Sequence, residues 1–266
     1  MGKMMNFLTD RDKKWLSEAH PELKPNENCI SGLIEFTATY DEQSGRFFPT
    51  EKEVKNTDAG VLLSGSFSIN IKERTNTSIS KLPALYVEGV DTTADRHFNQ
   101  NDHSACLCSP LEEDEFLVPQ FHFIPFIERL IIPFLYSQIF YSKENKWPWP
   151  EYAHGAVGIL ESYTKIKDPD KIYDCLKQLA RDSNAWPKIR TALLQKDNIK
   201  GGLPCFCKTG DHRRRCHPNA LSGIRQLKDD LKNSDAISYL EELDSVFKNP
   251  NIRPFNSPML YAKIKA

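Results

Sequence analysis

Three cysteines and a histidine lie close together near the C-terminal end of the sequence, in an arrangement typical of a metal site. Cys205, Cys207, Cys216 and His217 follow the pattern C-x-C-x8-C-H. Zinc takes four sulfur and nitrogen ligands in closed structural sites, and three thiolates with a neutral imidazole leave no position open. A turn at 209–211 is suited to reversing the chain between the two ligand pairs. The spacing therefore predicts one structural zinc ion.

A second group of chemically capable side chains lies between residues 95 and 108. It contains His97, Asn99, Cys106 and Cys108. A cysteine thiolate attacks acyl groups and holds them as thioesters. A side-chain amide stabilises the oxyanion that forms when an amine attacks such a thioester. We therefore predict thioester chemistry on Cys106 with Asn99 as the oxyanion donor, and we expect His97 to brace the loop more than to act as a base.

Two other interpretations of this loop stay open. His97, His103, Cys106 and Cys108 follow the pattern H-x5-H-x2-C-x-C, which is compatible with a second zinc ion. Alternatively, the loop is a connection with incidental polar residues and a buried thiol. The number of zinc ions per chain separates the first two interpretations, because one ion leaves Cys106 available as a nucleophile and two do not.

The C-terminal pattern resembles the SEC-C zinc motif, which has the same ligand spacing and a glycine-containing turn after its second cysteine. The resemblance covers residues 204–218. Phe206 stands where many family members carry proline, and Lys208-Thr209-Gly210 replaces a Gly-Ser-Gly-like turn. Neither change affects a ligand. Arg213, Arg214 and Arg215 within the motif either form a basic surface for an acidic partner or a phosphate backbone, or simply face solvent.

The loop around Cys106 resembles the active-site region of ubiquitin-conjugating (E2) enzymes, which place a His-Pro-Asn motif shortly before the catalytic cysteine. His97-Phe98-Asn99 is similar to that motif, and residues 82–86 are similar to the strand before it. More closely, the chain resembles bacterial E2-like proteins that end in a SEC-C motif and are linked with antiphage defence. The shared elements are Arg96 to Asn99, Cys106-Leu107, Trp147 to Trp149 and His154-Gly155.

This resemblance implies an E2-like (UBC) fold and a transferase that carries a ubiquitin-like protein as a thioester on Cys106 and passes it to an amine. The implied partners are the modifier, its activating enzyme and a protein substrate. The sequence departs from the family by Phe98 in place of proline, by a different spacing to Cys106, and by Cys108 as a competing nucleophile. The alternative is a catalytically inactive E2-like protein that binds or connects partners.

Hydrophobic periodicity indicates which elements position these residues. Thr9 and Asp12 have capping-box spacing for an N-terminal helix. Helical spacing dominates after Ile124, with a kink expected near Pro133. Alternating patterns predict strands at 34–40 and 61–72, and a short apolar run predicts a third at 82–87.

The order of these elements predicts an α+β class with an antiparallel sheet and flanking helices. We expect an E2-like domain over residues 1–165. The helical C-terminal region is expected over 166–266 and contains the zinc motif.

Composition limits the class of protein. The 266 residues carry 35 basic and 36 acidic side chains, so binding to nucleic acid through bulk charge is disfavoured. Seven cysteines are too few for a disulfide scaffold, so we expect a cytoplasmic location, with Cys29 and Cys175 as core thiols. Prolines and charges interrupt the apolar stretch 116–141, so we expect a buried segment and no membrane span.

Overall fold

The chain folds into two compact units with different secondary structure. The computed structural model describes residues 8–49, 60–74, 80–99, 101–166, 168, 171–207, 209–234 and 240. The N-terminal unit comprises residues 1–108 and 113–151, and the C-terminal unit comprises 109–112 and 152–266. The first contains an antiparallel sheet, and the described part of the second contains helices and no strand. The α+β class is therefore as expected.

The boundary between the units lies before helix α6 (Gly155–Tyr163), earlier in the chain than expected. A boundary near residue 165 would place α6 in the sheet domain. In the structure α6 packs against α7 (Lys171–Arg181) and α10 (Pro218–Asn233), which both belong to the C-terminal unit.

The N-terminal unit begins with helix α1 (Asp10–Ala19), and its first turn has the predicted capping box. The Asp12 N–H donates to the Thr9 hydroxyl at 3.1 Å, and the Thr9 N–H donates to the Asp12 carboxylate at 2.9 Å. Both bonds satisfy donors that a helix start otherwise leaves unpaired. Trp15 on this helix meets Phe123 edge-on, with 6.2 Å between ring centroids.

The sheet is antiparallel and follows the order β1-β2-β4-β5, with β3 also paired to β2. The two long strands pair along their whole length, from Cys29 opposite Lys72 to Tyr40 opposite Val61. The three predicted strands are present, with β2 starting earlier and β5 slightly later than expected. The strands are β1 (Leu23–Pro25), β2 (Cys29–Asp41), β3 (Arg46–Phe48), β4 (Val61–Lys72) and β5 (Ala84–Val87).

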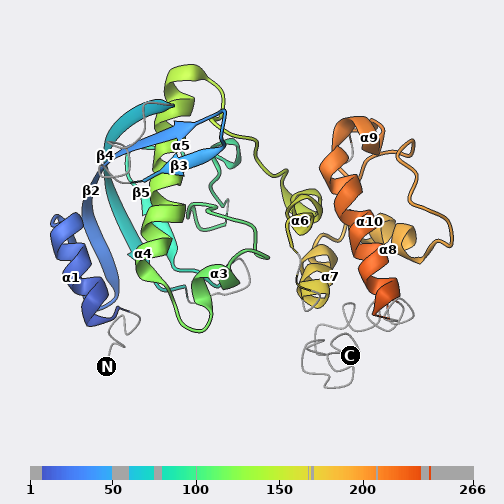
Figure 1. Ribbon diagram of the computed structural model, residues 1–266, viewed down its shortest axis with the longest axis horizontal. Coiled ribbons are helices and arrows are strands. Elements are labelled where there is room, and N and C mark those ends of the chain that lie inside the picture. The colour runs from blue at the N-terminus through green and yellow to red at the C-terminus, as the bar shows by residue number, and fades with distance from the viewer. Residues whose placement is uncertain are drawn as a thin grey trace. The chain divides into compact units, whose positions relative to one another are not determined.

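The two faces of the sheet differ in character because side chains alternate along each strand. The inner face is apolar and buried and includes Ile30, Ile34, Ile69, Ile71 and Leu85. It packs against a long helix composed of α4 (Phe123–Phe126), the turn η2 (Ile127–Ile131) and α5 (Ile132–Glu144) (Figure 1). The outer face carries exposed serines on β4, Ser64 and Ser66.

The irregularity expected near Pro133 is a π-helical turn, η2, directly before α5. Pro133 lies inside this continuous helix, two residues after η2, and its missing N–H removes one bond of the helical ladder, a common cause of irregular helix geometry. By length and composition the helix 123–144 is able to cross a membrane, but 67% of its most apolar window is buried, which is typical of a core helix in a soluble protein.

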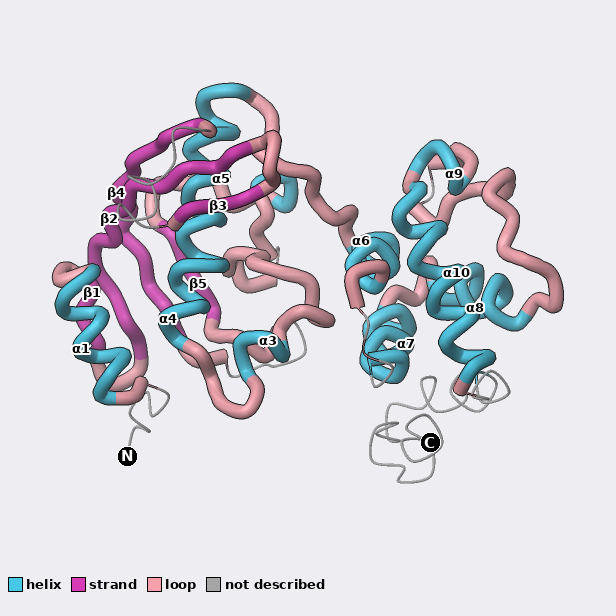
Figure 2. The backbone as a smooth tube through the Cα atoms, viewed as in Figure 1, coloured by secondary structure: helices cyan, strands magenta, loops and turns pink. Residues whose placement is uncertain are grey.

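The C-terminal unit is built from α6, α7, α8 (Trp186–Leu194), the short α9 (Arg213–Cys216) and α10, with a long loop before α9 (Figure 2). Gly223 on α10 allows a close helix crossing, because a Cβ there would lie 1.8 Å from the Leu160 carbonyl oxygen on α6. The buried Lys228 donates to the Asp197 carbonyl at 2.9 Å and to that of Gln195, just after α8. Lysine here satisfies carbonyls near a helix end.

Two cysteines expected in the core have different surroundings. Cys175 on α7 is fully buried, as predicted, in the core of the C-terminal unit. Cys29 is only half-buried, and the expectation that it is a core thiol was wrong, because it starts β2 on the outer face of the sheet.

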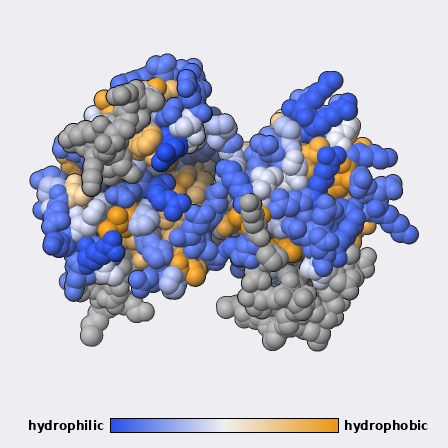
Figure 3. Space-filling model, viewed as in Figure 1, coloured by the Kyte–Doolittle hydropathy of each residue, from blue (hydrophilic) through white to orange (hydrophobic). Residues whose placement is uncertain are grey.

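The surface drawn in Figure 3 is largely hydrophilic, with scattered apolar side chains.

Candidate functional site

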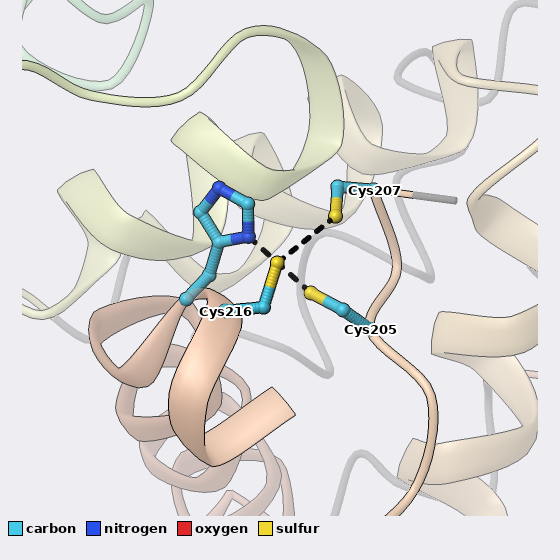
Figure 4. A group of neighbouring side chains, drawn as sticks. Cys205, Cys207 and Cys216 are labelled. Atoms are coloured by element: carbon cyan, nitrogen blue, oxygen red, sulfur yellow. Dashed lines mark hydrogen bonds between the residues drawn. The ribbon is translucent and has the colours of Figure 1, made fainter. Parts of the chain in front are cut away.

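The four predicted metal ligands come together in the C-terminal unit. The ligand atoms of Cys205, Cys207, Cys216 and His217 all lie within 4.8 Å of one another. Cys205 Sγ is 3.3 Å from His217 Nδ1, and Cys207 Sγ is 3.4 Å from Cys216 Sγ (Figure 4). A tetrahedral ion with metal–sulfur bonds of about 2.3 Å places its sulfurs roughly 3.8 Å apart. The donor set and its spacing therefore fit one tetrahedral metal ion.

The backbone around this group reverses as the turn at 209–211 predicts. Residues Pro204 and His212 pair as an antiparallel bridge, and the Cys205 N–H donates to the Asp211 carbonyl at 2.7 Å. Gly210 supplies a positive φ of 86° within the turn, a conformation that glycine adopts without strain. The chain then enters α9, so that Cys216 ends one helix and His217 directly precedes α10.

The local electrostatics distinguish the ligand thiols. Burial works to raise the pKa of Cys207, but hydrogen bonds with Thr209 and with the neighbouring thiols lower it to about 6. Thr209 Oγ1 lies 3.2 Å from Cys207 Sγ and 3.2 Å from Cys216 Sγ. The pKa of Cys205 is raised to about 11, chiefly by burial. A bound cation favours the thiolate form of each ligand.

Phe206 and Arg213 lie next to the metal ligands in the sequence and pack against each other. Phe206 is buried in the core of the C-terminal unit, and the Arg213 guanidinium lies 4.2 Å from its ring centroid. Arg213 also donates through Nε to the Pro204 carbonyl at 3.1 Å. Of the three arginines considered as a basic surface, Arg213 is therefore not available, because it is buried in a cation–π contact. Arg214 and Arg215 are exposed.

In the N-terminal unit, residues 97–99 pair with residues 104–106 as a short antiparallel ladder, which contains Cys106. Phe98 and Ala105 pair as an antiparallel bridge and are both buried. The Cys106 N–H donates to the His97 carbonyl at 2.7 Å, and the Asn99 N–H donates to the Ser104 carbonyl at 2.8 Å. These pairings place Cys106 opposite His97, and Asn99 opposite Ser104. The Ala105 N–H also donates to the Leu85 carbonyl at 2.8 Å, which attaches the ladder to β5.

The Asn99 amide is engaged inside this ladder. Its Nδ2 donates to the Ser104 hydroxyl at 3.0 Å and to the Ser104 carbonyl at 3.2 Å. The sequence predicted an oxyanion donor, and in this structure the donor protons of Asn99 are directed at Ser104. The amide thereby fixes the loop two residues before Cys106.

His97 is braced by residues from a later part of the chain. Its Nε2 contacts the Glu151 carboxylate, and its ring lies edge-on to Trp147 with 4.9 Å between centroids. Its backbone is left-handed, with φ of 59°. These contacts agree with a bracing role for the imidazole.

The ladder does not gather its other ligand-type side chains into a metal site. Among the described residues, which include His97, His103, Cys106 and Cys108, the C-terminal group is the one set whose ligand atoms converge. The His103 ring faces the Thr92 hydroxyl at 3.5 Å, whereas His97 contacts Glu151. The geometry therefore gives no support to a second zinc ion.

Cys106 is exposed to solvent, yet the pKa of its thiol is raised, which disfavours the thiolate form. The residue is exposed, but surrounding protein atoms desolvate the sulfur and raise its pKa above the ordinary value. Arg74 acts in the opposite direction, and Glu113 adds a negative charge that raises the pKa further. Glu113 is itself buried, and accepts from the Lys81 N–H at 2.9 Å. Burial also raises the pKa of its carboxyl group.

This arrangement predicts how Cys106 responds to pH. We expect its rate of alkylation by iodoacetamide to keep rising beyond pH 9, because only the thiolate reacts. Glu113→Gln removes a negative charge while keeping an acceptor for Lys81, so the pKa of Cys106 falls and the rate profile moves to lower pH. Peptide mapping by mass spectrometry measures the modification at Cys106. Glu115→Gln, an exposed acid paired with Arg129, is the matched control, and equal shifts in both variants would contradict the assignment.

Several residues around Cys106 were missed by sequence reasoning. Arg74 acts to lower the pKa of Cys106, Asp102 accepts a hydrogen bond from Arg74, and Glu151 contacts His97. Arg74 and Glu151 belong to no local pattern that links them to the site. Glu113 lies in the acidic run 112–115, whose charge pattern predicts exposure to solvent, whereas Glu113 is buried. The one local signal is the position of Asp102 two residues before Ser104, a spacing at which an aspartate accepts from a backbone N–H.

Comparisons with known proteins add no assignment. No protein-family model, curated protein or solved structure matches this chain.

Proposed function

We propose that the chain is an E2-like transferase that carries a ubiquitin-like protein as a thioester on Cys106. The observation that carries this proposal is an exposed cysteine at the end of a ladder that the Ala105 N–H attaches to the Leu85 carbonyl on β5, the last strand of the sheet. Supporting it is the order of elements along the chain: an N-terminal helix, the strands β1 to β5 of one antiparallel sheet, the ladder, and a core helix. That order agrees with an E2-like fold.

The proposed chemistry is two successive acyl transfers without redox change. The Cys106 thiolate attacks the thioester that links the modifier to its activating enzyme, and the enzyme's thiolate leaves. A substrate amine then attacks the new thioester, the Cys106 thiolate leaves, and the amine loses a proton to form an amide. In this scheme Asn99 positions the thiol through Ser104, and His97 braces the loop.

The raised pKa of Cys106 favours a second candidate function. A thiol that stays protonated near neutral pH is a weak nucleophile until a partner changes its surroundings. An inactive E2-like adaptor would retain the fold and the ladder but form no adduct. Such a protein would bind its partners equally well after Cys106→Ser.

A comparison of adducts separates the two functions. The full chain, tagged and expressed in its native cells, is isolated without reductant and examined by gel electrophoresis and mass spectrometry. The transferase predicts a protein adduct that a thiol reductant cleaves, that Cys106→Ala abolishes and that Cys108→Ala retains. Partner binding without any such adduct would instead support the adaptor.

We further propose that the ion held by Cys205, Cys207, Cys216 and His217 is one structural zinc. Three sulfurs and one imidazole nitrogen are its preferred ligands, and they leave no open position. The seven cysteines form no disulfide in the described residues, which supports a reducing, cytoplasmic location. A role in antiphage defence rests on the family resemblance alone.

Arg213 is expected to strengthen zinc binding. Three thiolates and Zn²⁺ carry a net charge of −1, and the buried guanidinium beside Cys205 compensates it. Arg213→Met removes that charge and the bond to Pro204, so we expect zinc affinity to fall by about tenfold or more. Chelator competition measures this affinity. Arg215→Met, which changes an exposed arginine of the same short helix, is the control, and equal affinities in the two variants would refute the role.

A further inference from the structure

A buried arginine from outside the Cys106 ladder is the centre of a hydrogen-bond network that fixes it. Arg74 follows the end of β4 and belongs to neither side of the ladder. Its Nη1 donates to the Asp102 carboxylate at 2.7 Å, its Nη2 to the Ser104 hydroxyl at 2.8 Å, and its Nε to the Leu82 carbonyl at 3.2 Å. The guanidinium thus links the segment before β5 to the ladder that follows β5.

Ser104 connects this arginine to Asn99. Its side chain is completely buried. Its hydroxyl accepts from Arg74 and from Asn99 Nδ2, and donates to Asp102 Oδ1 at 2.7 Å. The hydroxyl therefore uses its donor and both acceptor positions. Fully satisfied buried networks of this kind hold a unique geometry.

The burial of the Arg74 charge makes the arrangement costly to disturb. The Arg74 side chain is 6% exposed and the Asp102 side chain 30%. Removal of one partner from such a pair leaves a charge without compensation in a poorly hydrated place. Burial alone would raise the pKa of Asp102, but Ser104 and Arg74 lower it below its ordinary value. Asp102 therefore remains ionised opposite Arg74.

We propose that Arg74 is the positioning residue of the Cys106 loop, acting through Asp102 and Ser104 to hold Asn99 and the strand that carries the thiol. The catalytic meaning of this role rests on the proposed function. The structural role does not, because it concerns the order of residues 97–106 in the resting protein. Arg74 also places a positive charge near Cys106, opposite in effect to Glu113.

The full zinc-bound chain and three substitutions test the proposal. Arg74→Met removes the charge and the bonds, whereas Arg74→Lys keeps the charge but cannot make all three directed bonds. Arg129→Met is the matched control, because Arg129 pairs with Glu115 at 2.9 Å while both side chains are 60% exposed. Hydrogen exchange of the peptide spanning 97–106 reports loop order. The pH profile of Cys106 alkylation reports the thiol's electrostatic environment.

We expect both Arg74 variants to lose protection in 97–106 by an order of magnitude or more, and Arg129→Met to retain it. The alkylation midpoint is expected to rise in Arg74→Met and to stay near the wild-type value in Arg74→Lys. Below the midpoint, each unit of rise slows the reaction about tenfold. A merely structural role would loosen the loop in both variants without this difference between them.

The proposal is overturned if Arg74→Met leaves exchange in 97–106 and the alkylation midpoint unchanged. It is also overturned if the two Arg74 variants shift the midpoint equally. Should Arg74→Met fail to fold, Asp102→Asn breaks the same pair from its more exposed side and is expected to lose protection in 97–106 as well. None of these measurements needs the modifier, so absence of a thioester adduct would count against the proposed function and leave this result unaffected.

Discussion

Cys216→Ser is expected to empty the metal-binding group and to destabilise the C-terminal unit by about 4 kcal/mol, a size typical of losing a structural metal. Cys216 ends α9 and lies beside Cys207, so the substitution leaves three ligands around an ion that requires four. Without the ion, this segment keeps the backbone bonds of the turn and the packing of Phe206 and Arg213, but it loses the bonds that tie Cys205 and Cys207 to the start of α10. A metal-bound fold draws part of its stability from the binding free energy itself.

Metal analysis and thermal unfolding measure this effect together. We expect one zinc per wild-type chain, none in Cys216→Ser, and one in Cys29→Ser, a half-buried cysteine outside the metal group. A strong chelator should lower the melting temperature of the wild type to that of Cys216→Ser and leave the variant unchanged. Two zinc ions per wild-type chain would contradict the single site, and would revive the alternative in which Cys106 and Cys108 are ligands.

The features that could be predicted from sequence are those in which neighbouring residues determine the outcome. The capping box joins Thr9 to a residue three positions later, and the alternation along 61–72 determines which side chains face the core. The ligand pattern from Cys205 to His217 is similarly compact, and a turn is enough to close it. In each case the spacing within one short segment sets the geometry.

The features that could not be predicted depend on contacts between distant segments. The pair Arg74–Asp102 spans 28 residues and His97–Glu151 spans 54, and neither has a local pattern. Arg213 lies in a run of three arginines, a pattern typical of a solvent-exposed loop, but it is buried because its guanidinium packs over the Phe206 ring. The Asn99 amide was predicted to face a reaction intermediate. Ser104 is only five residues further along, but the two residues are paired within a ladder that a long-range bond from Ala105 to Leu85 attaches to the sheet.

The ladder also defines what a serine at position 106 should do. Cys106→Ser keeps the backbone bond to the His97 carbonyl, and the smaller side chain fits the same exposed position. A serine hydroxyl is a weaker nucleophile than a thiolate, and its acyl product is an oxygen ester, which thiols do not cleave. If Cys106 carries the modifier, Cys106→Ser is expected to accumulate an adduct that survives reductant and that hydroxylamine releases.

The comparison with Cys108 makes this outcome specific to one sulfur. Cys108→Ser is the matched control, since it makes the same chemical change two residues away at a half-buried position. Its adduct should remain on Cys106 and should still be removed by reductant. A reductant-resistant adduct in Cys108→Ser, with none in Cys106→Ser, would move the acyl group to Cys108. That result would also argue against the catalytic role proposed for the Asn99–Ser104 contact. This contact holds the strand that carries Cys106, and Ser104 is closer along the chain to Cys106 than to Cys108.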